Sequence, residues 1–289
     1  MGGNAAVVQA LLEIDTLDLD GVCNLGRTPL WYSVDAWDTT TTTILLGRGA
    51  NPNRSDLAGS SPLHRASIGR NGENFKSVDM LLADGHVDVN ARDKLGKTPL
   101  HWAVKNENNT LVRALLGRED IDLNVADGEG DTPLLLCARL LSERFDARDM
   151  GDIAEFLAAS EKVNLNRRDS YGRTALAFAA RAGSDSLVSL LLSRGADPKV
   201  TDDCGMTPLE LAVRKEHREV VRLLLSHGGE DPGRFDWLWD RDSGASWAEH
   251  VLSFVGPGAL ASRPLRRSRS MEAVVRFSRK DLSRKQVRF

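Results

Sequence analysis

The hydrophobic residues of this chain gather in short segments that come in pairs and recur about every 33 residues. In each pair, a glycine is followed two residues later by a tetrapeptide of the Thr-Pro-Leu type, and a second apolar segment such as LVSLLLS follows it. The spacing between successive tetrapeptides is 33, 37, 34, 42 and 33 residues. This pattern predicts six helix pairs, and their tetrapeptides begin at Thr28, Ser61, Thr98, Thr132, Thr174 and Thr207.

Each part of the repeated unit has a local physical reason. The glycine allows a turn with positive φ, which a larger residue adopts only with strain. The Thr or Ser that follows is a preferred N-cap, and its side chain is worth about 1 kcal/mol over alanine. Proline then stands at the first helical position, where the missing N–H has no intrahelical partner to lose. The tetrapeptide therefore predicts the start of the first helix in each pair.

A period near 33 with the motif T-P-L-H-x-A resembles the ankyrin repeat family. The resemblance implies an all-α solenoid of antiparallel helix pairs, with a β-hairpin loop at each junction. It covers residues 1–230, with a partial helix over 4–14 and repeats that start near 24, 57, 94, 128, 170 and 203. Extra residues near 70–74 and 142–150 are expected between the two helices of their repeats. The partial helix indicates either an abbreviated cap or a fragment of a longer chain.

Residues 231–289 have a different character. Residues 231–258 predict an aromatic linker and a short helix over 246–255, which either caps the last repeat or docks a partner. Residues 259–289 predict a disordered tail. From 263 to 289 there are ten Lys or Arg and two acids, a charge of +8, so the total of −3 leaves −11 on residues 1–262. Ser268 and Ser270 follow arginines and are candidate phosphorylation sites.

The residues that usually carry catalysis show no catalytic arrangement in this sequence. His64 and His101 stand at the histidine of T-P-L-H, which in the family bridges neighbouring repeats by hydrogen bonds. The other histidines lack metal-ligand spacing, and no nucleophile or phosphate-loop motif occurs. Three separated cysteines predict free thiols in a reducing compartment. We therefore expect no catalytic residue, no metal site and no cofactor.

In the family, proteins bind to the hairpin tips and to the concave face formed by the first helices. Leucine, tyrosine and methionine recur at these tips, and we expect Leu95, Tyr171 and Arg173 near the energetic centre. The alternative is that the tips only pack against adjoining loops. Tyr32 and Trp102 are interpreted as packing residues, and Trp37 as a surface residue. The full set of expected contact residues is Leu25, Arg27, Leu57, Lys94, Leu95, Lys97, Lys105, Glu129, Asp131, Tyr171, Arg173, Arg181, Met206 and Arg214.

The sequence predicts a non-catalytic scaffold or adaptor that binds a partner protein, which is partly basic because residues 1–262 are acidic. We expect a monomer inside the cell, in the cytoplasm or alternatively in the nucleus, since no segment is apolar enough to span a membrane. Two alternatives stay open. In the first, the tail 263–289 is the functional part and binds nucleic acid, acidic lipid or a phosphoserine adaptor. In the second, the chain is the C-terminal ankyrin region of a larger signalling protein.

Overall fold

The computed structural model of the chain describes residues 18–69, 75–143 and 148–229. The chain divides into two units, residues 1–231 and residues 232–289, and every described residue lies in the first. The predicted helix over 4–14, the linker and capping helix of 231–258, and the tail with Ser268 and Ser270 lie outside the described residues.

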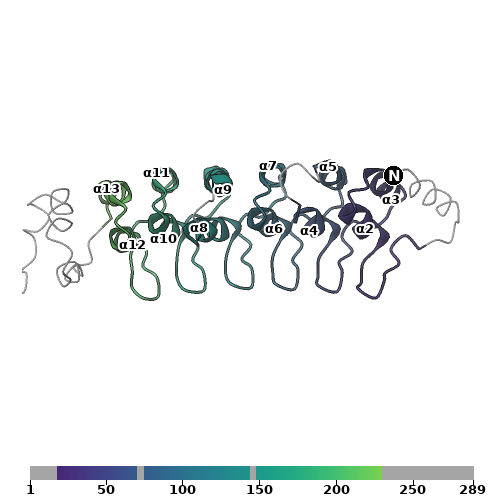
Figure 1. Cartoon of the computed structure of the whole chain (residues 1–289), viewed down its shortest axis with the longest axis horizontal. Helices are drawn as coiled ribbons and strands as arrows, with labels where there is room; N and C mark the ends of the chain where they lie inside the picture. Colours follow the sequence, from purple (N-terminus) through teal and green to yellow (C-terminus); the bar gives the residue numbers. More distant parts are fainter. Residues whose placement is uncertain (1–17, 70–74, 144–147, 230–289) are drawn as a thin grey trace, which may run out of the picture. The chain divides into compact units, whose positions relative to one another are not determined.

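Helices in the described residues alternate between two layers, which run side by side along the first unit (Figure 1). The inner helices, next to the projecting loops, are α2 (Pro29–Asp35), α4 (Pro62–Ala66), α6 (Pro99–Lys105), α8 (Pro133–Glu143), α10 (Ala175–Ala182) and α12 (Pro208–Arg214). The outer helices are α3 (Thr39–Gly47), α5 (Phe75–Ala83), α7 (Asn109–Leu116), α9 (Arg148–Ala159), α11 (Asp185–Ser193) and α13 (Arg218–Ser226). Each helix packs against the other member of its pair and against neighbours in its own layer. The predicted all-α solenoid is confirmed.

The inner helices begin as the tetrapeptides predict. In α6, Thr98 has extended backbone angles, its side chain accepts a hydrogen bond from the backbone N–H of His101 at 3.5 Å, and Pro99 is the first helical residue. The tips between successive pairs were expected to be β-hairpins. They are closed by hydrogen bonds such as Asp56 N–H to Ser60 O at 3.0 Å, but the described residues contain no strand.

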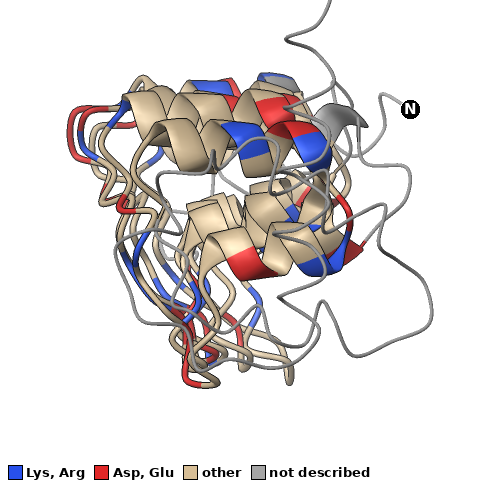
Figure 2. Ribbon diagram, turned by 90° about the vertical axis from the view of Figure 1, so that its left-hand side faces the viewer, with Lys and Arg blue, Asp and Glu red and all other residues tan. Residues whose placement is uncertain are grey.

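The core lies between the two layers and between neighbouring repeats. In α13, Val220, Val221 and Leu224 are buried, because these positions fall on one face of the helix. Viewed along the row, the loops and parts of the helices contain Lys, Arg, Asp and Glu, while much of the helix ribbon is formed by other residues (Figure 2). A single repeat has nothing else to cover its apolar surface, so its stability depends on its neighbours.

The insertion near 142–150 was expected between the two helices of its repeat, and this is only partly correct. Ser142 and Glu143 belong to α8, and Arg148 begins α9. These helices have 11 and 12 residues, against 7 and 8 in α6 and α7. The insertion therefore lengthens both helices and leaves residues 144–147 between them, because added residues with helical propensity extend the existing turns.

Candidate interaction surface

The loop tips are fixed to one another by backbone hydrogen bonds. The N–H of Leu57 donates to Leu25 O at 2.9 Å, and the N–H of Lys94 donates to Ala58 O at 3.0 Å. Gly59 has φ of 79°, and a Cβ there would lie 2.9 Å from the backbone nitrogen of Lys94. The glycine is thus required both for its left-handed conformation and for the close approach of the next tip. The tips form a connected edge rather than separate loops.

Four large apolar side chains project from this edge. Leu25, Leu57, Leu95 and Tyr171 are 51%, 62%, 58% and 64% exposed, although their backbones are held by the tip hydrogen bonds. We call these four residues the apolar ridge. Arg173 stacks its guanidinium over the Tyr171 ring at 4.6 Å and bonds the carboxylate of Asp169 at 2.7 Å, so this part of the edge is preorganised.

Most of the expected contact residues lie at the surface. The exposed ones are Leu25, Leu57, Lys94, Leu95, Lys105, Glu129, Tyr171, Arg181 and Arg214, and the half-buried ones are Arg27, Arg173 and Met206. Lys97 and Asp131 are buried, at 6% and 2% exposure, so the expectation that they lie at exposed tips is wrong. Each follows a tip glycine, and from this position its side chain turns back into the protein.

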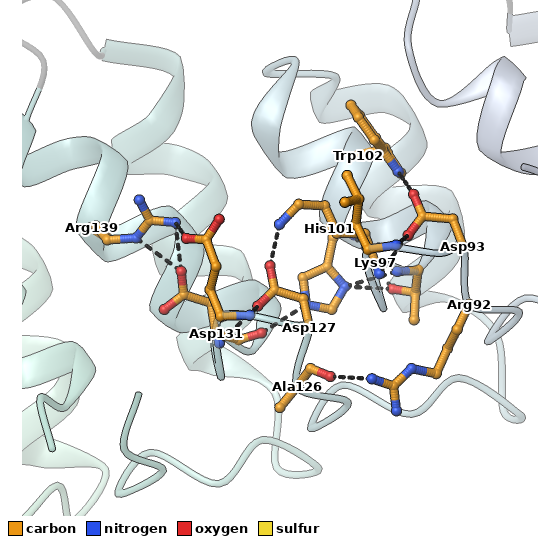
Figure 3. A network of polar contacts seen from close by, with 12 residues as sticks. Arg92, Asp93, Lys97, His101, Trp102, Ala126, Asp127, Asp131 and Arg139 are labelled. Atoms are coloured by element: carbon orange, nitrogen blue, oxygen red, sulfur yellow. Dashed lines mark hydrogen bonds and ion pairs between the residues drawn. The ribbon is translucent and has the colours of Figure 1, made fainter. Parts of the chain in front are cut away.

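Lys97 and Asp131 belong to a polar network between the third and fourth repeats (Figure 3). The Lys97 ammonium pairs with Asp127 of the next tip, and Asp131 accepts two hydrogen bonds from Arg139, the shorter at 2.6 Å. Burial acts to raise the pKa of Asp127, but the Lys97 ammonium and backbone N–H donors outweigh it and hold the pKa below its usual value. These charges stabilise the junction instead of meeting a partner.

The two T-P-L-H histidines complete the junctions, as the family resemblance implied. Nδ1 of His101 accepts the backbone N–H of Thr98 at 3.1 Å, so Nε2 carries the proton and donates to Asp131 O at 3.0 Å. His64 makes the same pair of bonds, with Ser61 and with Lys97 O. Burial lowers the pKa of His101 to about 4 and also lowers that of His64. Both rings are neutral at physiological pH and serve as structural bridges.

Side chains on the inner helices add to the exposed edge. Tyr32 was expected to pack in the core, yet it is 42% exposed, and Trp102 is half-buried and donates from Nε1 to Asp93 at 2.8 Å. Tyr32, Arg65 and Trp102 each stand four residues after an N-cap. The sequence pattern did not point to this position as a surface. Counting residues from each N-cap would have identified it as a surface position. The fourth residue after the cap lies on the same helix face as the seventh, where Lys105 and Arg181 were expected to contact a partner.

Two classes of site are not found in the described part of the chain. Within residues 18–69, 75–143 and 148–229, no group of three or more His, Cys, Asp or Glu is placed to hold a metal ion. No described helix has the length and apolar character needed to cross a bilayer. Cys137 is buried, which raises the pKa of its thiol, whereas Cys23 and Cys204 are exposed.

A family model described as "Ankyrin repeats (3 copies)" matches the chain twice, over residues 63–147 and 144–236. Together these matches cover more than half of the sequence. The chain belongs to the ankyrin repeat family. Ankyrin repeats are in general protein-interaction modules and are typically non-catalytic.

Known proteins agree with this assignment over most of the chain. Human neurogenic locus notch homolog protein 2 is 31% identical over 211 residues, which are 68% of this chain and 8% of the relative. The crystal structure of the ankyrin repeat domain of Bcl-3 has a TM-score of 0.64 and 27% identity, covering 76% of this chain and 91% of that one. An ankyrin repeat domain from Acinetobacter baumannii AYE has a TM-score of 0.61 and 28% identity, with coverages of 69% and 97%. This chain thus spans a small part of its notch relative.

Proposed function

We propose that this protein is a non-catalytic interaction scaffold that binds a partner protein on the apolar ridge and the adjoining inner-helix surface. The observation that carries the proposal is the combination of exposure and rigidity in Leu25, Leu57, Leu95 and Tyr171. Exposed apolar and aromatic side chains on a fixed backbone lose little entropy when a partner covers them. Aromatic residues and arginine also dominate the energetic centres of protein interfaces.

The test is capture of partner proteins by the intact chain and by a Leu95→Ala/Tyr171→Ala double variant. Each of these side chains is more than half exposed, so the double variant should keep its melting temperature within about 3 °C. Truncating two central contacts should weaken capture by about tenfold or more. A double variant that retains full capture would contradict the proposal.

A matched variant separates binding from structure. Leu95→Met/Tyr171→Phe keeps the apolar volume and the ring at the same two positions, so it should capture the partner nearly as well as the natural chain. If capture and melting temperature fall together in the alanine variant, the two residues are structural, and the alternative in which the tips only support adjoining loops is correct.

The alternative in which the tail binds nucleic acid, acidic lipid or a phosphoserine adaptor is tested by deleting residues 263–289. Under our proposal the shortened chain captures the same partner as the intact chain. If capture is lost and depends steeply on salt, the tail is the binding element. We also propose that the protein is a monomer inside the cell, in the cytoplasm or the nucleus.

A further inference from the structure

The tip between α9 and α10 carries a serine directly beside the apolar ridge. Residues 167–171 read Arg-Arg-Asp-Ser-Tyr, and their loop is one of those that project from the row of helices (Figure 1). Ser170 is exposed, and its hydroxyl forms no hydrogen bond with any described residue. At the equivalent point the other tips have Asn24, Leu57, Lys94, Gly128 and Asp203. The fold therefore does not require a hydroxyl at this point.

The local turn presents this hydroxyl to solvent. The buried carboxylate of Asp169 accepts hydrogen bonds from the backbone N–H groups of Tyr171 and Arg173, at 2.9 and 2.8 Å. The N–H of Gly172 closes the same turn by donating to Asp169 O at 3.0 Å. Ser170 stands between the buried Asp169 and Tyr171, which is 64% exposed. An enzyme can therefore approach the Oγ atom of Ser170 from solvent.

The first of the two arginines that face this turn along the sequence has a free side chain. Arg167 is exposed, and its guanidinium makes no hydrogen bond or ion pair with any described residue. Ala91 and Val125 stand at the equivalent point before the tips of the third and fourth repeats, so the fold does not require an arginine there. The guanidinium of Arg167 is thus open to a protein that approaches the tip.

The second arginine is held by the fold. Arg168 donates to Gly172 O at 2.9 Å and to Thr201 O at 3.1 Å, which ties its tip to the next one. Arg92 makes a similar contact in the third repeat, where it donates to Ala126 O at 2.8 Å. The role of Arg168 in the closed tip is therefore structural, and its guanidinium is released only when the tip opens locally.

From these contacts we infer that Ser170 is a phosphorylation site for an arginine-directed serine kinase. Kinases of this class hold arginines at the third and second residues before the serine with their own carboxylates. Among the serines and threonines that the structure describes, Ser170 alone has arginine at both positions. The kinase binds Arg167 in the closed tip and gains Arg168 when the tip opens.

The reaction transfers the γ-phosphoryl group of ATP to Ser170. A bond forms between Oγ and the γ-phosphorus, and the bond from that phosphorus to the oxygen that leads to the β-phosphorus breaks, so ADP leaves. The hydroxyl proton passes to a carboxylate base of the kinase. The product carries about two negative charges at pH 7, at a point of the tip that had a neutral hydroxyl.

The consequence of this phosphate rests on the proposed function, because it acts on the apolar ridge. Ser170 directly precedes Tyr171, and a Cβ at Gly130 would lie 2.9 Å from the backbone nitrogen of Ser170, so the phosphate stands where two tips meet. A partner that covers Tyr171 with apolar groups must remove water from the phosphate, which costs free energy. Phosphorylation of Ser170 therefore closes this part of the ridge to an apolar partner.

The modification is tested on the full chain with a purified arginine-directed serine kinase and ATP. Every sample carries Ser268→Ala/Ser270→Ala to remove the two candidate sites of the tail, and mass spectrometry locates the phosphate. We expect phosphate on Ser170 and a rate about tenfold lower in Arg167→Gln, which loses one charge-assisted contact to the kinase. Arg54→Gln is the matched control, since it removes an exposed arginine at the equivalent point of the second repeat and should keep the full rate.

A synthetic peptide of residues 164–174 gives the rate for a segment that is always open. If the folded chain takes no phosphate at Ser170, the inference is wrong, and modification of the peptide alone would show that the tip is too rigid. Equal slowing in Arg54→Gln and Arg167→Gln would also overturn it.

The effect on binding is measured with a peptide probe, selected from random peptides displayed on phage with the unphosphorylated chain as bait. The chosen probe is one that Leu95→Ala/Tyr171→Ala no longer binds. Fluorescence anisotropy should show about tenfold weaker binding after phosphorylation of Ser170, and no change in Ser170→Ala after the same treatment. Full binding to the phosphorylated chain would contradict the closing of the ridge. If no such probe can be selected, the scaffold function fails, while the phosphate on Ser170 is judged by the kinase assay alone.

Discussion

The junction between the first two repeats and the junction between the third and fourth use the same positions in different ways. After the tip glycine, Lys97 pairs with Asp127 of the next tip, and the two side chains are 8% and 0% exposed. At the equivalent place, Arg27 lies 3.5 Å from Asp56 and is 31% exposed. One ion pair is enclosed by protein, while the other borders solvent.

The residue at the histidine position explains this difference. His101 fills its site in the third repeat and donates to Asp131 O. In the first repeat Trp31 stands there, and Arg27 lies over its ring at 3.9 Å, where the guanidinium stays partly in solvent. The Nε1–H of Trp31 is buried and has no acceptor among the described residues. At the histidine position the third repeat therefore satisfies its buried polar group, whereas the first repeat leaves the Trp31 N–H without an acceptor and has an aromatic ring covered by a cation there.

The largest expected effect comes from breaking the enclosed pair. Lys97→Met leaves the buried Asp127 carboxylate without its cation and should lower the free energy of unfolding by about 3 kcal/mol. Arg27→Met, at the equivalent position, should cost about 1 kcal/mol or less, since this pair is long, at 3.5 Å, and the Arg27 side chain is 31% exposed. Urea unfolding curves of both variants provide the measurement.

A control for this pair is Lys97→Met/Asp127→Asn, which removes both charges. It should be more stable than Lys97→Met alone, because no unpaired carboxylate is left inside the protein. If Lys97→Met and Arg27→Met lower the free energy of unfolding equally, the different burial of the two ion pairs does not make the two junctions differ in stability.

Acidification should weaken the histidine-bridged junctions next. The pKa of His101 is about 4 in the folded protein, against an ordinary value of 6.5. Below pH 6.5 the His101 imidazole binds a proton in the unfolded chain but not in the folded chain. Its contribution to stability is therefore fully present above pH 6.5 and is lost as the pH falls toward 4. The loss from this residue is at most about 3 kcal/mol.

The measurement is urea unfolding at several values between pH 7 and pH 4.5. A His101→Leu variant starts from lower stability, but its curve against pH should be flatter because one titrating group is gone. The pKa of His64 is also lowered, so the His101→Leu variant should still lose some stability as the pH falls, though less than the natural chain. Parallel curves for the variant and the natural chain would show that His101 does not carry the effect.

The smallest expected effect is a gain in stability within the first repeat. Trp37 has φ of 58° and is 49% exposed, and Gly183 occupies the equivalent place in the fifth repeat with φ of 73°. A left-handed conformation costs a non-glycine residue about 1–2 kcal/mol. Trp37→Gly should relieve this strain and, after the entropy that glycine loses on folding, raise the free energy of unfolding by about 0.5–1 kcal/mol.

Trp37→Ala is the matched control, because it removes the ring and keeps the strained backbone. Thermal unfolding should show a higher melting temperature for Trp37→Gly than for Trp37→Ala. If the glycine variant is the less stable of the two, the backbone at Trp37 is not strained in solution.

Much of the fold was predictable because ankyrin repeats are specified locally. Thr98 and Pro99 start α6 through capping and a preset φ, and Gly59 permits its tip through positive φ, whatever lies elsewhere in the chain. The exposed tip positions Leu57 and Leu95 were also readable from their distance to the glycines. The sequence did not show the lengths of α8 and α9, or that residues 144–147 would lie between them. An insertion can extend a helix or a loop at a similar cost in free energy.

The sequence by itself determined the repeat, the starts of the inner helices and the family, since each follows from short-range patterns that recur along the chain. Only the tertiary structure decided that Lys97 and Asp131 turn inward and that Tyr32 reaches the surface. These outcomes depend on which side chains from neighbouring repeats come within a few ångströms of one another. Stacking brings together residues about 30 apart in sequence, and no local pattern shows which of them will be covered.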